Sequence, residues 1–374
     1  QEYFRENTGY NSVEELESDF DKYIGVCVWE ELMDRHKKST LCELVLEPMR
    51  SLIPEMYETL RRSSPEFLGS KRERRFTAIE EFVLVLRYFV GGRSLRTLAF
   101  QYSVTPSYVD LLVWNGAILI NVFFVPYFFR VYSPDDAIRL HTPVDLRTNV
   151  NSRLFIVGDP AERICTDSSD RRLSHATWSS KLKKLHSVKI CPIDFLNGYR
   201  TWRPPLYGGR AEETMMFDSC PYITDPKLLT DSSPPVTVVF DRAYEFFRKD
   251  RFLEHLRAHR PPGFVEIFET KVTFAVPSRH KRNMKHADMD FAHDYVVSSF
   301  RHGVETRHHR SYIFFRFGDK MTLPVSQIPL YELGHDISIA LSNRDILISN
   351  GIDPADGFGK GYDRAMARAE YLSS

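Results

Sequence analysis

The sequence predicts a mixed α/β protein whose strand-rich part follows an all-helical part. Short apolar runs separated by turn residues occupy 161–207 and recur at 236–241, a pattern typical of β-strands. Apolar residues at helical spacing occupy 76–124 and 241–259, which predicts helices before and after the strands. With 43% hydrophobic and 13% aromatic residues over 374 positions, the chain can bury the cores of two or three domains.

The first motif lies in 94–113, where two helical patterns flank a short turn. Thr105 is a favoured helix N-cap, and Pro106 is favoured at the first helical position. This arrangement predicts a helix-turn-helix, with a plain helical bundle as the alternative. In a helix-turn-helix, Thr105, Ser107 and Tyr108 begin the recognition helix, so they are candidates for contact with DNA.

The strand-rich part begins with a short apolar pattern that ends at Asp167 and is followed by small polar residues. Two further apolar runs occupy 186–195 and 199–207, and Asn197 and Gly198 lie between them. An Asn-Gly pair tolerates the positive φ angles of a hairpin turn. We therefore expect three consecutive antiparallel strands.

Further acidic residues follow a second strand pattern and a late helical pattern. VTVVFD (236–241) predicts a buried strand that ends in Asp241. The stretch 295–315 predicts a helix that carries Glu305 among basic and aromatic residues. Carboxylates are the ligands that hard cations such as Mg²⁺ prefer. Acids at strand ends and on a late helix, with glycines and basic residues between them, predict a metal-dependent nuclease.

Several short motifs in order resemble the catalytic domain of DDE transposases, in particular the Harbinger-like and Kolobok-like endonucleases. The matching motifs are TDSSD at Asp167, WSSK at 178–181 with Lys189, YGGR at 207–210, DRAY at 241–244 and R-x-x-V-E at 301–305. The similarity spans roughly residues 76 to 350. The resembling families have aspartate where this chain has Glu213 and glycine where it has Ala243.

The resemblance implies an RNase H-like catalytic domain preceded by the helix-turn-helix. It implies that Asp167, Glu213 and Glu305 hold two Mg²⁺ or Mn²⁺ ions. One ion activates water for strand cleavage, and later a DNA 3′-hydroxyl for attack on the target phosphodiester. The implied partner is double-stranded DNA, at transposon ends and at the target, bound by a homo-oligomer in the nucleus.

Other interpretations remain open at this point. The second acid has three possible substitutes, Glu212, Asp218 and Asp241. A catalytically inactive, transposase-derived DNA-binding or interaction protein is the main alternative function. It is favoured by the glutamate at position 213 and by a formal net charge of +0. A hydrolase of small phosphoesters is a third possibility.

Contacts with DNA require local excesses of positive charge, because the 50 Lys and Arg residues are balanced by 50 Asp and Glu residues. The candidates for phosphate contact are Lys181, Lys184, Arg210, Arg301 and Arg307. Trp178 and Tyr207 are predicted to be core aromatic residues rather than platforms for nucleotide stacking.

The remaining sequence features exclude some classes of protein. Five scattered cysteines without a Cys-x-x-Cys pair predict neither a zinc module nor a disulfide framework. The longest apolar run is too short to predict a membrane span. We expect a helical N-terminal region at 1–70, a helix-turn-helix domain at 71–130, a connector at 131–160, a catalytic domain at 161–350 and a tail at 351–374.

Overall fold

The structure is a computed structural model of the 374-residue chain. It describes residues 84–85, 87–89, 94–123, 125–146, 152–158, 161–179, 185–211, 216–217, 219–240, 249–275 and 322–352. The chain divides into two compact units. Unit 1 comprises residues 1–128, 311–318 and 329–374, and unit 2 comprises residues 129–310 and 319–328.

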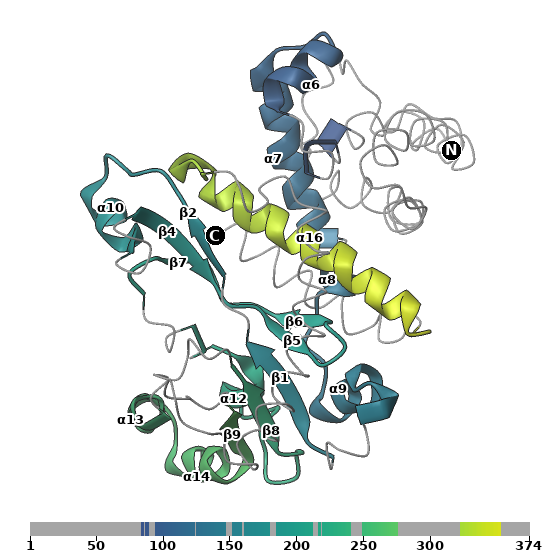
Figure 1. The fold of residues 1–374 in the computed structure, drawn as a ribbon, viewed down its shortest axis with the longest axis vertical. Helices are drawn as coiled ribbons and strands as arrows, with labels where there is room; N and C mark the ends of the chain where they lie inside the picture. Colours follow the sequence, from purple (N-terminus) through teal and green to yellow (C-terminus); the bar gives the residue numbers. More distant parts are fainter. Residues whose placement is uncertain are drawn as a thin grey trace, which may run out of the picture. The chain divides into compact units, whose positions relative to one another are not determined.

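The described part of unit 1 is helical (Figure 1). Residues 84–85 and 87–89 are helical. They are followed by α6 (Leu95–Gln101), α7 (Pro106–Phe123) and α8 (Val125–Phe128). The long helix α16 (Ile328–Ser349) belongs to this unit from Pro329 onward.

A tight turn joins α6 to α7. The N–H of Tyr102 donates to the carbonyl of Leu98 at 2.9 Å, which closes the last turn of α6. Ser103 then adopts a φ of 54°, which reverses the chain. As the sequence predicts, α7 begins at Pro106, and the Thr105 hydroxyl accepts from the N–H of Tyr108 at 3.3 Å.

Close contacts and buried amides hold the helices of unit 1 together. A Cβ added to Gly116 would meet Val85 Cγ2 at 2.5 Å, so α7 and the helical residues 84–85 approach closely at the glycine. The amide of Asn121 donates to the Leu333 carbonyl at 2.9 Å, and that of Asn343 donates to the Phe128 carbonyl at 2.6 Å. Each buried side-chain amide therefore links α16 to an earlier helix.

The larger sheet of unit 2 has five strands in the order β6-β5-β1-β8-β9 (Figure 1). β1 (Leu154–Gly158) pairs antiparallel with β5 (Ile193–Phe195), and β5 pairs antiparallel with β6 (Arg200–Trp202). On its other side β1 pairs parallel with β8 (Val236–Val239), and β8 pairs parallel with β9 (Val272–Ala275). The first strand is therefore central, the next two lie on one side, and the last two lie on the other.

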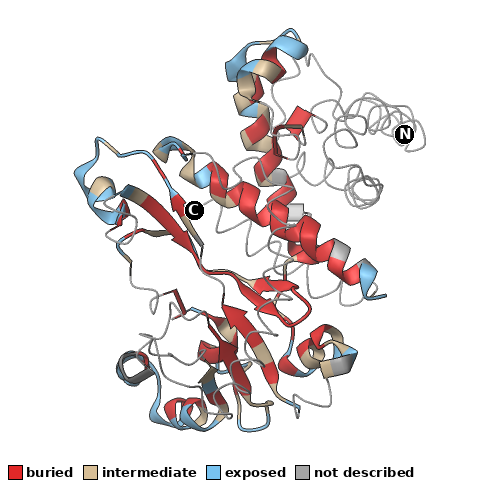
Figure 2. Cartoon of the chain, viewed as in Figure 1, coloured by how far each residue is buried: buried red, intermediate tan, exposed pale blue. Residues whose placement is uncertain are grey.

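Helices cover and connect this sheet. α9 (Pro134–His141) and the short η2 (Val144–Leu146) precede β1, and α9 contacts β1. α12 (Pro221–Thr224) precedes β8. α13 (Lys249–His259) and α14 (Pro262–Lys271) lie between β8 and β9, as a crossover between parallel strands requires. Figure 2 shows the strands of this sheet mostly buried.

A smaller sheet in the same unit contains β2 (Ala161–Ile164), β4 (Leu185–Ile190) and β3 (Trp178–Ser179) in the order β2-β4-β3. β7 (Tyr207–Gly208) also pairs with β4. α10 (Arg171–Thr177) lies between β2 and β3 in the chain and contacts β4 and β7. In Figure 2 the exposed residues of this region gather on and around α10.

The two sheets share one register of antiparallel pairing. Paired residue numbers of β1 and β5 add up to 351, as in 158 with 193. Those of β2 and β4 add up to the same value, as in 161 with 190. The register is therefore the same before and after positions 159 and 160. In this register β5 pairs with β1 and β4 pairs with β2.

Most local predictions in the strand-rich part are confirmed. Strands occupy 161–164, 185–195 with one interruption, and 236–239. Gly198 has a φ of 82° in the hairpin between β5 and β6, and its N–H donates to Phe195 O at 2.8 Å. The mixed parallel and antiparallel pairing agrees with the predicted mixed α/β class.

Three features differ from the sequence-based expectations. The central strand β1 and helix α9 lie inside the segment 131–160, which the sequence suggested was a connector. β9 follows α14 without a turn signal, so the apolar pattern did not separate it from the helix. α16 groups with unit 1 rather than closing the strand-rich unit, because its buried contacts are with the helices of that unit.

An aromatic cluster around His141 forms part of the core of unit 2. The imidazole stacks on Phe195 with ring centroids 4.9 Å apart, and it lies at an interplanar angle of 34° to the ring of Tyr199 with centroids 4.4 Å apart. Tyr132 meets the same ring edge to face at 4.6 Å. Tyr222 ties the cluster to the backbone, since its hydroxyl accepts from the N–H of Tyr132 at 3.0 Å. These contacts hold α9 against β5 and the hairpin that follows it.

Candidate functional site

Among the three predicted metal-binding acids, the structure describes Asp167, whereas Glu213 and Glu305 lie outside the described residues. Asp167 follows β2, beyond a bridge in which Cys165 pairs with Leu323. It thus belongs to the smaller sheet rather than to the five-stranded sheet.

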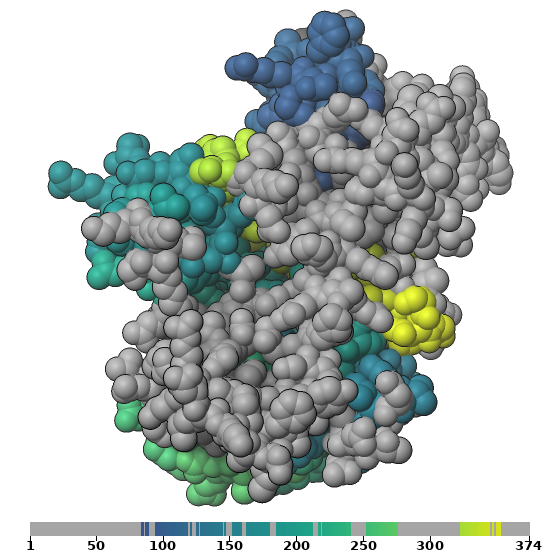
Figure 3. Space-filling model, viewed as in Figure 1, coloured from purple at the N-terminus to yellow at the C-terminus, as the bar shows by residue number. Residues whose placement is uncertain are grey.

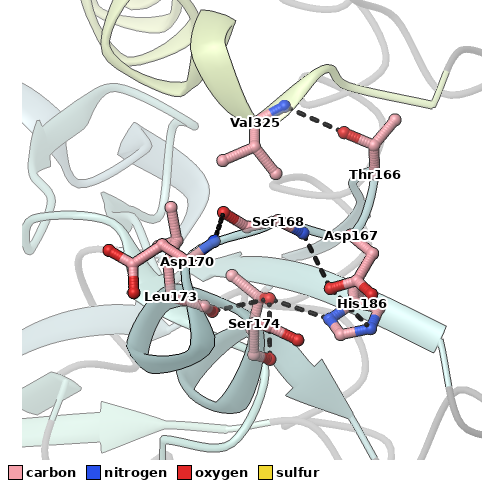
Figure 4. Close-up of polar contacts among 9 residues, drawn as sticks. Thr166, Asp167, Ser168, Asp170, Leu173, Ser174, His186 and Val325 are labelled. Carbon is pink, nitrogen blue, oxygen red and sulfur yellow. Dashed lines mark hydrogen bonds and ion pairs between the residues drawn. The ribbon is translucent and has the colours of Figure 1, made fainter.

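The carboxylate of Asp167 has local partners (Figure 4). Its Oδ1 accepts from the N–H of Ser168 at 2.7 Å and lies 3.3 Å from Nε2 of His186. Its side chain is 64% exposed. The hydroxyl of Ser174, then the N–H of Ser168 and the charge of His186, lower the pKa of Asp167 from its ordinary value. Asp167 is therefore an ionised surface carboxylate that orients a histidine.

The other ring nitrogen of His186 is engaged by α10. Its Nδ1 lies 2.9 Å from the hydroxyl of Thr177, which donates to the carbonyl of Leu173 at 2.9 Å. Asp170 caps the same helix, because its carboxylate accepts from the N–H of Arg172 at 2.8 Å. The imidazole is consequently fixed between the end of α10 and the loop that precedes that helix.

Trp178 is not a core residue, so this prediction is wrong. The side chain is 40% exposed, and the ring meets that of His186 at 5.3 Å between centroids with an interplanar angle of 71°. The two residues are cross-strand partners in β3 and β4. β3 has only two residues, of which Ser179 is buried and Trp178 is exposed. Tyr207 in β7 is half-buried.

The two glycines of the YGGR motif permit close packing. A Cβ on Gly208 would collide with the carbonyl oxygen of Ala176, and a Cβ on Gly209 would collide with the hydroxyl of Ser187. Arg210 follows, donates its N–H to the same carbonyl of Ala176 at 3.2 Å, and contacts the His175 ring with its guanidinium. Arg210, a predicted phosphate contact, is therefore exposed beside α10.

The other predicted phosphate contacts, Lys181, Lys184, Arg301 and Arg307, lie outside the described residues. In unit 1, Thr105 and Ser107 are exposed and Tyr108 is half-buried. The structure places these three together at the start of α7.

The carboxyl ends of β1 and β8 form a second location for acids. The strands pair in parallel without a shift of register, from 154 with 236 to 157 with 239. A Cβ on Gly158 would lie 2.9 Å from Phe217 and 3.2 Å from Phe240, and these two rings meet edge to face at 4.7 Å. The end of β1 therefore packs closely against the rings of Phe217 and Phe240.

In the sequence an aspartate follows each of these strand ends, Asp159 after Gly158 and Asp241 after Phe240. Both aspartates lie outside the described residues. Asp159 is not among the residues that the sequence motifs single out. The sequence nevertheless contained a signal for this position, since the apolar run LFIVG that precedes Asp159 is longer than the apolar run that precedes Asp167.

Within the described ranges, no three His, Cys, Asp or Glu side chains are grouped so that they could hold a metal ion. In the same ranges no helix has both the length and the apolar character needed to cross a membrane. Comparison with protein-family models, with curated proteins and with solved structures finds no match.

Proposed function

We propose that unit 2 is an RNase H-like nuclease domain and that the chain acts on DNA as a DDE-type endonuclease or transposase. The reaction is metal-dependent hydrolysis of DNA phosphodiesters, followed by strand transfer from a 3′-hydroxyl. We further propose that α6, the turn and α7 are a helix-turn-helix, with Thr105, Ser107 and Tyr108 at the start of its recognition helix.

The strand order supports the RNase H-like proposal. Three strands in chain order, β1, β5 and β6, form an antiparallel meander, and two later strands, β8 and β9, add in parallel on the opposite side of β1. An RNase H-like domain is built on a five-stranded sheet of this order. The resemblance of the sequence motifs to DDE transposases points to the same fold independently.

The observation that carries the function is the register of β1 and β8. Neighbouring strands lie about 4.8 Å apart, and partners in a parallel pair point to the same face of the sheet. Extension of this register by two positions beyond 157 with 239 would make Asp159 and Asp241 such partners; both lie outside the described residues. Ligand sites of α/β sheets form outside the carboxyl ends of their parallel strands.

On this basis Asp159 and Asp241 replace Asp167 and Glu213 as the first and second metal-binding acids, and Glu305 remains the predicted third. Asp167 already orients His186, and its carboxylate lies on the smaller sheet. With Asp241 as the second metal-binding acid, activity does not depend on whether position 213 is aspartate or glutamate.

Hard carboxylate oxygens fit Mg²⁺ or Mn²⁺, and such a pair of ions supplies an activated hydroxyl and stabilises the leaving oxygen. The protein's own contribution is to fix the two acids. Gly158, Phe217 and Phe240 pack tightly beneath the strand ends, and the N–H of Phe240 donates to Ala275 O at 3.0 Å. This packing fixes Gly158 and Phe240, which directly precede the two aspartates in the sequence.

Nicking of supercoiled plasmid DNA in Mn²⁺ tests the proposal. We expect Asp159→Asn and Asp241→Asn to lower the nicking rate by at least about 10²-fold, because displacement of a reacting group by about 1 Å already costs that much. The matched control, Asp167→Asn, should stay within a few-fold of the wild type. Folding of each variant is checked by circular dichroism.

Other outcomes have defined meanings. Loss of nicking in Asp167→Asn alone would contradict the assignment of Asp159 and support the motif-based one. A wild-type chain that binds duplex DNA but does not nick it in Mn²⁺ would overturn the nuclease proposal. It would favour the inactive, transposase-derived DNA-binding protein, which the balanced charge of the chain also favours.

A further inference from the structure

The exposed indole of Trp178 is held in a rigid setting. Its ring meets His186, whose two nitrogens lie 2.9 Å from the Thr177 hydroxyl and 3.3 Å from the Asp167 carboxylate. Thr177 is itself bonded to the carbonyl of Leu173 in α10. A surface aromatic fixed in this way loses little conformational entropy when a ligand binds to it.

Basic side chains lie on and beside the helix that leads into the strand of this indole. Arg171, Arg172 and His175 are exposed on α10, the helix that ends one residue before Trp178. Arg210 contacts His175 and bonds to the carbonyl of Ala176, so it lies beside the same helix. We call Trp178, Arg171, Arg172, His175 and Arg210 the Trp178 surface. Figure 3 shows the teal atoms of this region at the surface of the molecule.

The charge of this region is strongly biased. Residues 161–211 contain ten Lys or Arg residues and four Asp or Glu residues, a net charge of +6, in a chain whose total is +0. Arg163 and Lys189 are buried, and Asp194 is buried against Arg200 at 3.0 Å, so without these four residues the range carries seven basic and three acidic residues, a net charge of +4. A local excess of this kind favours a polyanionic partner.

We propose that the Trp178 surface binds unpaired DNA, with a base stacked on Trp178 and adjacent phosphates held by Arg210 and the arginines of α10. An aromatic ring beside a basic surface is the arrangement with which proteins bind single strands, because every base presents a flat face. In a duplex these faces are already stacked, so the indole selects single-stranded segments. The inference rests on the proposed function in one respect, namely that the nucleic acid is DNA.

Fluorescence anisotropy of the full chain with a labelled 20-nucleotide oligo(dT) and with a blunt 20-base-pair duplex tests this surface. Stacking on one aromatic residue contributes about 1–3 kcal/mol per base, so Trp178→Ala should weaken oligo(dT) binding by about 5- to 150-fold. Trp178→Phe should recover most of this loss. Affinity for the duplex should change by no more than about twofold in both variants.

Two further variants test whether the effect is specific to this surface and whether Arg210 holds a phosphate. Val144 on η2 is 76% exposed and lies outside both proposed DNA-binding surfaces, so Val144→Ala should leave oligo(dT) binding unchanged. Arg210→Gln should weaken oligo(dT) binding and reduce its dependence on log salt concentration by about 0.7, as expected for one lost phosphate contact to a single strand.

The inference is overturned if the wild type does not bind oligo(dT), if Trp178→Ala binds it as well as the wild type, or if that variant loses duplex affinity equally. Its failure is distinguishable from that of the proposed function. The double variant Asp159→Asn, Asp241→Asn should lose nicking yet keep oligo(dT) affinity. If Trp178→Ala nicks DNA normally and binds oligo(dT) as well as the wild type does, the proposal for the Trp178 surface is rejected and the proposed nuclease function stands.

Discussion

Buried His141 should make unit 2 less stable as the pH falls from 8 to 5. The residue is 1% exposed, stacks on Phe195 and packs against Tyr199, and its Nδ1 lies 3.0 Å from the amide nitrogen of Asn197. Burial, followed by the charge of Arg130, lowers the pKa of His141 from 6.5 to about 3. The folded protein therefore keeps this imidazole neutral.

The magnitude follows from the difference between the two pKa values of His141. The unfolded chain, with a pKa of 6.5, binds the proton more tightly than the folded chain, with a pKa of about 3. The stability contributed by the neutral ring is thus present above pH 6.5 and is lost as the pH falls below it. At pH 5 the loss relative to pH 8 is about 2 kcal/mol, and below pH 3 it approaches about 5 kcal/mol.

Urea unfolding at pH 8 and pH 5 measures this loss in the wild type and in His141→Phe. The variant keeps an aromatic ring in the stack and removes the titrating group, so its stability should fall by about 2 kcal/mol less than that of the wild type between the two pH values. The lost contact with Asn197 lowers its stability at both pH values and cancels in the difference. Exposed His259 provides the control, since His259→Gln should behave as the wild type does. Equal pH dependence in the wild type and in His141→Phe would contradict the burial argument.

Five further substitutions test the packing by their urea midpoints, and two of them, Glu269→Gln and Gly263→Ala, are matched controls. Asp194→Asn leaves a buried arginine without its charge partner and should cost about 3–5 kcal/mol, whereas Glu269→Gln, in an exposed ion pair, should cost less than about 1 kcal/mol. Gly209→Ala should cost about 1–3 kcal/mol or more through overpacking, whereas Gly263→Ala, in open space in a helix, should be neutral or stabilising by up to about 1 kcal/mol. Gly116→Ala should cost about 1–3 kcal/mol in unit 1. Equal effects within either matched pair would argue against the contacts described here.

Local signals in the sequence were sufficient for several elements. The Asn197 and Gly198 turn is set by one positive φ angle, and the cap of α7 by one hydroxyl and one proline. The strand before Asp241 is a continuous apolar run. Each of these features depends on residues only a few positions apart, so sequence patterns predict them well.

Non-local pairing decided the elements that the sequence did not reveal. β1 is central because β5 and β8 pair with its two edges, and both partners are distant in the chain, as in the pairing of position 156 with positions 195 and 238. Trp178 is exposed because its strand is very short and ends beside a short helix. Residue type alone favoured burial for this tryptophan, and the length of the strand reversed that preference.

The shared register also relates the two proposed sites. Cys165 lies opposite His186, the cross-strand partner of Trp178, and the N–H of Cys165 donates to the carbonyl of His186 at 2.9 Å. Asp159 precedes Cys165 by six residues in the sequence. In the two proposals, the acid pair and the stacking residue therefore lie on successive segments of unit 2, an arrangement in which one DNA strand engages both. Asp167, which follows β2 and contacts His186, is suited to hold the stacking residue in place rather than to take part in cleavage.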